Sequence, residues 1–269
     1  MRELTIRGGL TAVVEDAASA PRPPILFIHG TFGGAWQFEA FQRYFAELGY
    51  SSYAINLRGH HGSRAVPDLG RVSVLDYVAD ALPVARALGR PIVIGHSMGG
   101  LVAQKLAEAG AVAAAVLLCS AAPKGISILT PLLVAKQVKH ARELLLSRPI
   151  VPNARDVNDL AFNRIPPAER AALFARLVPD SGRAGREMSF GAIAVDERKV
   201  HCPVLSISAA EDRFVPPRVG RQLARKYHGE LLQLAEHAHF ITGEPGWEAV
   251  AAEVGRWLGP RIGIADGRR

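Results

Sequence analysis

The chain has few cysteines, no long apolar run and no block of one charge. Cys119 and Cys202 are the two cysteines among 269 residues, and each borders an apolar stretch, so we expect buried thiols and no disulfide framework. No stretch approaches the roughly 18 apolar residues of a transmembrane helix. The N-terminus also lacks the apolar region of a secretion signal. We therefore expect a cytoplasmic protein with no stable membrane insertion.

The basic residues are scattered, although the formal net charge is +7. The densest basic tract, residues 136–142, alternates with apolar residues at helical spacing, which is typical of a solvated helix face. Zinc-ligand spacing and RNA-binding signatures are missing, so no nucleic-acid partner is expected. With 49% hydrophobic and 21% charged residues, the composition is that of a globular chain with a sizeable core. No oligomeric state follows from it.

Short apolar runs alternate with amphipathic segments along most of the chain. Residues 5–14 resemble a hairpin that turns at Gly8-Gly9. Strands are expected at residues 25–28, 52–55, 91–94, 112–118, 204–208 and 231–234, with those at 25–28 and 91–94 buried. Helices are expected at residues 36–48, 74–88, 98–109, 218–227 and 247–258. This order predicts an α/β fold with a mostly parallel central sheet and helices on both faces.

The alternation stops between residues 123 and 199, where helical patterns continue and no convincing strand is found. The clearest helices there are residues 132–146 and 167–177. We predict an α/β core of residues 1–122 and 200–269, with an inserted helical cap at 123–199 over a site at the strand ends. The tail from residue 264 is expected to fray.

A glycine-rich turn lies between the expected strand ending near Ile94 and the expected helix after it. It reads Gly95-His96-Ser97-Met98-Gly99, and so tight a strand-to-helix turn leaves no room for side chains at its two glycines. The strained turn would raise the Ser97 hydroxyl above the sheet, in front of the amide end of the helix. The pattern and its context predict a nucleophilic serine.

A serine nucleophile needs a base, and the base needs an acid that orients it. In this architecture the chain order is serine, acid, histidine, with the last two after late strands. Asp212 is the predicted acid, with Glu211 as the alternative. His239 is the predicted base, with His237 as the competing residue.

The tetrahedral intermediate of acyl transfer needs two amide donors near its oxyanion. The N–H of Met98, directly after the nucleophile, is the first predicted donor. The second is expected from the loop after strand 25–28, where Gly30 permits a sharp turn and Thr31 is the best-placed residue. Phe32 is the alternative donor, or it lines the acyl pocket. We also expect His96 to contact the substrate.

Three stretches together resemble the α/β-hydrolase superfamily: His29–Trp36 (HGTFGGAW), Asn56–Ser63 (NLRGHHGS) and Gly95–Gly100 (GHSMGG). The first is similar to methylesterases and many bacterial carboxylesterases, and the third is similar to monoglyceride lipases. With the late acid and histidine, the resemblance covers almost the whole chain and implies the α/β-hydrolase fold. The second stretch departs from the family pattern, because Asn56 replaces an aspartate and His61 is an extra residue.

The predicted function is hydrolysis of a carboxylic ester of a small or medium apolar substrate through an acyl-enzyme. No metal and no organic cofactor is expected. The same residues would serve a thioesterase, a lactone or amide hydrolase, a carbon–carbon bond hydrolase or an acyltransferase. A ligand-binding protein with slow turnover is the alternative from another class.

Overall fold

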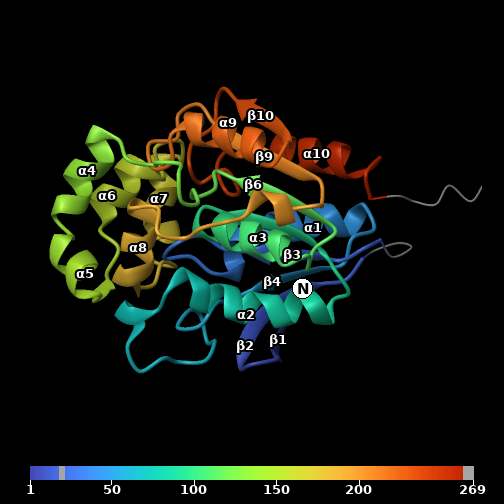
Figure 1. Ribbon diagram of the computed structural model, residues 1–269, viewed down its shortest axis with the longest axis horizontal. Coiled ribbons are helices and arrows are strands. Elements are labelled where there is room, and N and C mark those ends of the chain that lie inside the picture. The colour runs from blue at the N-terminus through green and yellow to red at the C-terminus, as the bar shows by residue number, and fades with distance from the viewer. Residues whose placement is uncertain (18–21, 263–269) are drawn as a thin grey trace, which may run out of the picture.

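The computed structural model describes residues 1–17 and 22–262, and its centre is an eight-stranded sheet (Figure 1). The strand order is β1-β2-β4-β3-β5-β6-β9-β10. The first two strands form an antiparallel hairpin, β2 pairs antiparallel with β4, and all other neighbours are parallel. The strands span Arg2–Ile6 (β1), Leu10–Glu15 (β2), Ile25–Ile28 (β3), Ser52–Ile55 (β4), Ile92–His96 (β5), Ala114–Leu118 (β6), Val204–Ala209 (β9) and Glu230–Leu234 (β10).

Helices cover both faces of this sheet, as predicted. On one face, α1 (Glu39–Glu47) and α10 (Trp247–Leu258) contribute to one apolar core, and the 3-10 helix η1 (Ala35–Phe38) leads into α1. On the other face, α2 (Val74–Ala87), α3 (Met98–Glu108) and α9 (Pro217–Lys226) contribute to a second core. The central strands β3, β5 and β6 are buried along their whole length, which explains their continuous apolar sequences.

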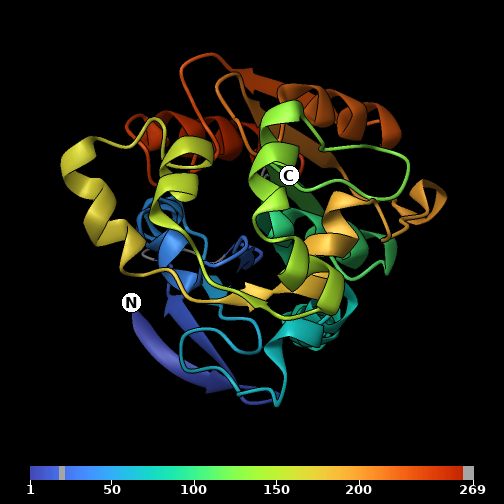
Figure 2. The same cartoon turned by 90° about the vertical axis from the view of Figure 1, so that its left-hand side faces the viewer.

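The connection from β6 to β9 contains five α-helices and a small two-stranded sheet, and we call residues 123–199 the insert. Its helices are α4 (Pro131–Val138), α5 (Ala141–Leu146), α6 (Ala154–Leu160), α7 (Pro167–Phe174) and α8 (Gly182–Ser189). Two-residue strands β7 (Pro149–Ile150) and β8 (Asp180–Ser181) pair antiparallel. Short 3-10 helices η2 (Leu69–Arg71) and η3 (Glu197–Lys199) complete the elements. The insert helices gather at one end of the sheet, and Figure 2 shows them from that side.

Two expectations for this region were wrong. The helix expected at residues 132–146 is divided into α4 and α5, because the chain turns at His140, whose N–H donates to Gln137 O. The expectation that the insert contains no strand missed β7 and β8, since a two-residue strand is too short to show an alternating pattern. The expected fraying from residue 264 lies outside the described residues. Within the part that the structure describes, no helix is both long and apolar enough to cross a bilayer.

Candidate active site

Ser97 occupies the sharp turn between β5 and α3. Its backbone angles are φ 52° and ψ −117°, a strained conformation for a residue with a side chain, and the residue is 5% exposed. A side chain at Gly95 would overlap the backbone of Gly99, and one at Gly99 would overlap the carbonyl of Ile28. The close packing therefore requires both glycines of the motif. It holds the serine at the carboxyl end of a central strand.

The structure brings the three residues predicted for nucleophile, base and acid together. His239 Nε2 lies 3.0 Å from Ser97 Oγ, and His239 Nδ1 lies 2.9 Å from Asp212 Oδ2. The other carboxylate oxygen, Oδ1, accepts the N–H groups of Phe214 and Val215 at 2.8 and 2.7 Å. Asp212 is thus fixed by two backbone donors while it orients the imidazole. Because Nδ1 must donate to the carboxylate, Nε2 of the neutral ring is the nitrogen free to accept the serine proton.

The competing histidine and carboxylate lie elsewhere. His237 Nδ1 lies 2.8 Å from Glu244 Oε1, which also accepts the N–H of Ala238. This buried pair fastens the loop that carries His239. Glu211 pairs with Arg164 at 3.2 Å on the surface, where both side chains are more than a third exposed. Neither competitor contacts Ser97 or His239.

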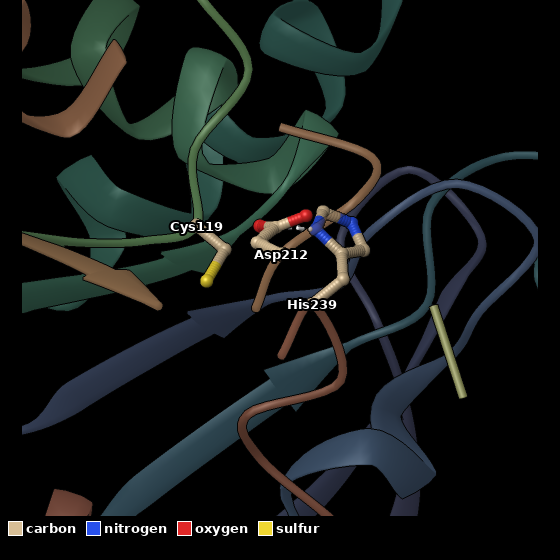
Figure 3. Close-up of side chains that lie close together, drawn as sticks. All are labelled: Cys119, Asp212 and His239. Carbon is tan, nitrogen blue, oxygen red and sulfur yellow. Dashed lines mark hydrogen bonds and ion pairs between the residues drawn. The ribbon is translucent and has the colours of Figure 1, made fainter. Parts of the chain in front are cut away.

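Cys119, Asp212 and His239 are a group of potential metal ligands whose donor atoms lie within 4.8 Å of one another. Figure 3 shows Asp212 between the other two side chains, with its carboxylate directed at the imidazole. Burial, followed by the charge of Asp212, raises the pKa of the Cys119 thiol well above its usual range. The thiol is therefore protonated, and the Asp212 oxygens already accept three hydrogen bonds. The donor set suits proton transfer along the serine–histidine axis better than it suits a metal ion.

The loop after β3 holds Thr31, one of the two predicted oxyanion donors, and the other, Met98, begins α3. Among the described residues, the N–H groups of Thr31 and Met98 donate to no protein acceptor. The alternative donor, the N–H of Phe32, is already bonded to the Asp180 carboxylate at 2.9 Å. The Gly30 N–H donates to Gln37 Oε1 at 3.1 Å. Of the three candidate amides, those of Thr31 and Met98 are thus without a protein acceptor in the described part of the chain, whereas that of Phe32 is bonded.

His96 adjoins the nucleophile and is nearly fully buried. Burial, followed by the proximity of His239, lowers the pKa of His96 to about 3, so its ring is neutral at ordinary pH. Its Nε2–H donates to His239 O at 2.8 Å, which ties the backbone of the proposed base to β5. Its Nδ1 has no hydrogen-bond partner within the described part of the chain. The ring still borders the pocket in front of Ser97, as expected of a residue near the substrate.

A cavity of about 150 Å³ opens in front of Ser97 and is enclosed largely by the insert. Its wall is mainly apolar and contains both predicted substrate-contacting residues, Phe32 and His96. The apolar side chains from the insert include Ile128, Leu133, Leu144, Ile150, Val157, Leu160, Phe162, Leu177 and Met188. Polar side chains from α4 and α6, including Gln137 and Asp156, lie along the same wall. The cavity therefore suits a largely apolar group next to the serine.

The residue that departs from the family pattern in the second motif has a structural explanation. Asn56 Oδ1 accepts the N–H of Ala35 at 2.6 Å, and its amide donates to Thr11 Oγ1 at 2.9 Å. The extra residue, His61, accepts the indole N–H of Trp36 at 3.2 Å. Both side chains thus hold the start of η1, where the loop after β3 ends.

Sequence reasoning missed several buried polar residues around this site, including Gln37, Asp180 and Glu244. Each acts on a residue that the motifs did identify, through the Gly30 N–H, the Phe32 N–H and His237 respectively. Gln37 lies between two aromatic residues, but Asp180 and Glu244 are flanked by proline, serine or glycine, as many surface loop residues are. Only the folded arrangement distinguishes them.

The comparisons with known proteins agree with this architecture. The model of the alpha/beta hydrolase family matches residues 25–253. The chain belongs to this family. A pyrethroid hydrolase from Sphingobium wenxiniae is 26% identical over 246 residues, 81% of this chain and 82% of that protein. A probable alcohol acetyltransferase of Saccharomyces cerevisiae is 35% identical over 99 residues, which is 35% of this chain and 29% of that protein.

A solved structure shares the fold over nearly its whole length. The monoacylglycerol lipase of Paleococcus ferrophilus superposes with a TM-score of 0.71 at 20% sequence identity, covering 93% of this chain and 98% of that one. The predicted α/β-hydrolase fold and the family resemblance are therefore confirmed.

Proposed function

We propose that the protein is a serine esterase that hydrolyses a carboxylic ester of a small or medium apolar substrate. The observation that carries this proposal is the continuous chain of contacts from Ser97 Oγ to His239 and on to Asp212, beside a largely apolar cavity. The relationship to a protein named as a pyrethroid hydrolase supports hydrolysis in general.

The proposed reaction begins when Ser97 Oγ attacks the ester carbonyl while its proton passes to His239 Nε2. The N–H groups of Thr31 and Met98 stabilise the negative charge on the carbonyl oxygen, and Asp212 stabilises the imidazolium that has formed. His239 then gives its proton to the departing alcohol, which leaves an acyl group on the serine. Water, deprotonated by His239, attacks this acyl-enzyme and releases the acid.

The insert takes the role of a cap in this proposal, as the sequence predicts for residues 123–199. It supplies most of the apolar wall of the cavity, so differences among substrates would be sensed there, while the core supplies the reacting groups. Phe32 and His96, which the core contributes to the same wall, are the proposed substrate contacts beside the nucleophile. No metal or organic cofactor enters the proposed steps.

Initial rates on p-nitrophenyl esters from acetate to palmitate test the proposal. Saturable turnover with an optimum at short or medium acyl chains is expected. The Ser97→Ala variant should fold normally and lose about 10³-fold or more in kcat, because no other group in the site replaces the nucleophile. Near-wild-type hydrolysis by this variant would exclude Ser97 as the nucleophile.

Acyl transfer to an alcohol is a second candidate, favoured by the partial match to a probable alcohol acetyltransferase. The acyl-enzyme would be the same, and an alcohol would replace water as its acceptor. Turnover of p-nitrophenyl acetate with increasing 1-butanol distinguishes the two. A new ester that accumulates in proportion to the alcohol would indicate transfer, whereas acetate alone would indicate hydrolysis. Thioesters, lactones, amides and activated carbon–carbon bonds form the remaining substrate panel.

A further inference from the structure

Asp180 is a buried carboxylate of the insert whose partners mostly belong to the core. It begins β8, is 1% exposed, and lies next to the loop after β3. Its Oδ2 accepts the N–H of Phe32 at 2.9 Å and faces His60 Nε2 at 3.2 Å. Its Oδ1 accepts the hydroxyl of Tyr77 at 2.7 Å and the N–H of Ser181 at 2.6 Å. One insert side chain thus joins three separate segments of the core.

The insert binds both backbone groups of Phe32, the N–H and the carbonyl oxygen. While Asp180 accepts its N–H, the N–H of Val178 donates to its carbonyl oxygen at 3.0 Å. Phe32 has a φ of 65°, in the left-handed region that a residue with a side chain adopts only when its surroundings hold it there. These two hydrogen bonds fix the residue that directly follows Thr31.

His60 supports the same carboxylate. Its Nδ1 faces Arg58 O at 3.0 Å and its Nε2 faces Asp180, so both ring nitrogens must carry protons in order to donate. Burial alone would lower the pKa of His60, but the charge and hydrogen bond of Asp180 outweigh burial and raise it. Hydrogen bonds from a charged donor to a carboxylate are stronger than neutral ones. They hold the Asp180 carboxylate in one orientation toward Phe32.

We propose that Asp180 is a positioning residue, through which the insert sets the backbone of the Phe32 loop and so aims the Thr31 N–H at the oxyanion. This inference rests on the proposed function, since it assigns a task to the oxyanion donors. The insert then contributes to the chemical step as well as to the shape of the cavity, although it contains none of the reacting groups.

The Asp180→Asn variant removes the charge with little change in volume. Because an oxyanion donor acts mainly in the transition state, kcat on the best p-nitrophenyl ester should fall about 10- to 100-fold, while KM changes less than about three-fold. The Asp180→Glu variant, which restores the charge, should recover part of the lost kcat.

Tyr77→Phe is the matched control. It removes a hydrogen bond to Oδ1 of the same carboxylate and leaves the Phe32 and His60 contacts on Oδ2 in place. It should lower the melting temperature and retain kcat within about three-fold. If Asp180→Asn and Tyr77→Phe reduce kcat equally for equal losses in melting temperature, Asp180 has only a structural role and the proposal fails.

Hydrogen exchange of the peptide covering residues 29–34 gives a readout that does not depend on turnover. In Asp180→Asn this peptide should exchange about ten-fold faster or more, and in Tyr77→Phe it should stay near the wild-type rate. Unchanged exchange in folded Asp180→Asn would overturn the proposal whatever the protein hydrolyses. Absence of ester turnover in the wild type would instead count against the proposed function, so the two failures are distinguishable.

Discussion

Two buried histidine–carboxylate pairs in this protein have nearly the same geometry and different surroundings. His239 and Asp212 are 2.9 Å apart, and His60 and Asp180 are 3.2 Å apart. The second nitrogen of His239 faces a serine hydroxyl, whereas the second nitrogen of His60 faces a backbone carbonyl. A carbonyl oxygen can only accept, so it keeps the His60 ring protonated. A hydroxyl can give up its proton, and this difference makes His239 suitable as a base and His60 suitable as a structural cation.

Among variants of these two pairs, the largest effect should come from Asp212→Asn. An asparagine cannot stabilise the imidazolium that forms on His239 during the reaction, and it favours the wrong tautomer of the neutral ring. We expect kcat to fall about 10⁴-fold with the fold intact, far more than for Asp180→Asn. Steady-state rates, with circular dichroism as the control for folding, measure it. A loss smaller than about ten-fold would mean that the two pairs do not differ as described.

The pH dependence of stability sharpens the comparison from the side of His60. The pKa of His60 is raised in the folded state, so protonated His60 adds to the free energy of unfolding. This contribution is fully present below the pKa of the unfolded state, about 6.5, and is lost as the pH rises through the pKa of the folded state. His60 faces Asp180 of β8, and the rings of Tyr77 in α2 and His29 after β3 pack against it. Burial, followed by the proximity of His60, lowers the pKa of His29 to about 3, so that neighbour stays neutral over this range.

His60→Gln should therefore reduce the free energy of unfolding by about 3 kcal/mol at pH 6, the usual cost of removing one partner from a buried ion pair. The difference from the wild type should shrink as the pH rises toward 9. Denaturant unfolding between pH 6 and 9 measures it, with the exposed His201→Gln as control. A difference that is constant over this range would show that His60 is neutral in the folded protein.

The smallest effect should come from Glu211→Gln, the carboxylate next to Asp212 in the sequence. Its pair with Arg164 is exposed to solvent, so the free energy of unfolding should change by less than about 0.5 kcal/mol and kcat by less than about two-fold. Comparing kcat of this variant with kcat of Asp212→Asn shows which of the two adjacent carboxylates is the acid. If kcat of Glu211→Gln falls more than ten-fold, Glu211 and not Asp212 is the acid.

The strand–turn–helix around Ser97 could be predicted because its causes are local. Gly95 and Gly99 are required by contacts within the turn and with the adjacent β3, and the chain order of the family directs attention to the loops after β9 and β10. The choice between His237 and His239 could not be settled from the sequence, since both follow the same strand. It depends on Glu244, seven residues after His237, whose carboxylate binds the His237 ring.

The role of Asp180 was beyond sequence reasoning for a different reason. Its partners Phe32, His60 and Tyr77 precede it by 148, 120 and 103 residues, so no spacing pattern relates them. The region where the expected helix at 132–146 is divided also makes contacts with residues distant in the sequence. Lys136 and Lys139 both pair with Asp156 of α6, a contact that exists only after the insert has folded. Sequence motifs can predict local backbone strain, but they cannot predict these contacts, which form only by tertiary packing.

The hydrogen bonds that Phe32 makes with Val178 and Asp180 have a consequence for engineering by segment exchange. Residues 123–199 connect two neighbouring parallel strands, so a homologous segment could be transplanted there without altering the strand register. A graft that matches the cavity but lacks an acceptor for the Phe32 N–H would leave the recipient loop unsupported. Chimeras designed for new substrates should therefore retain the stretch from Val178 to Ser181 of the recipient and vary the helices that precede it.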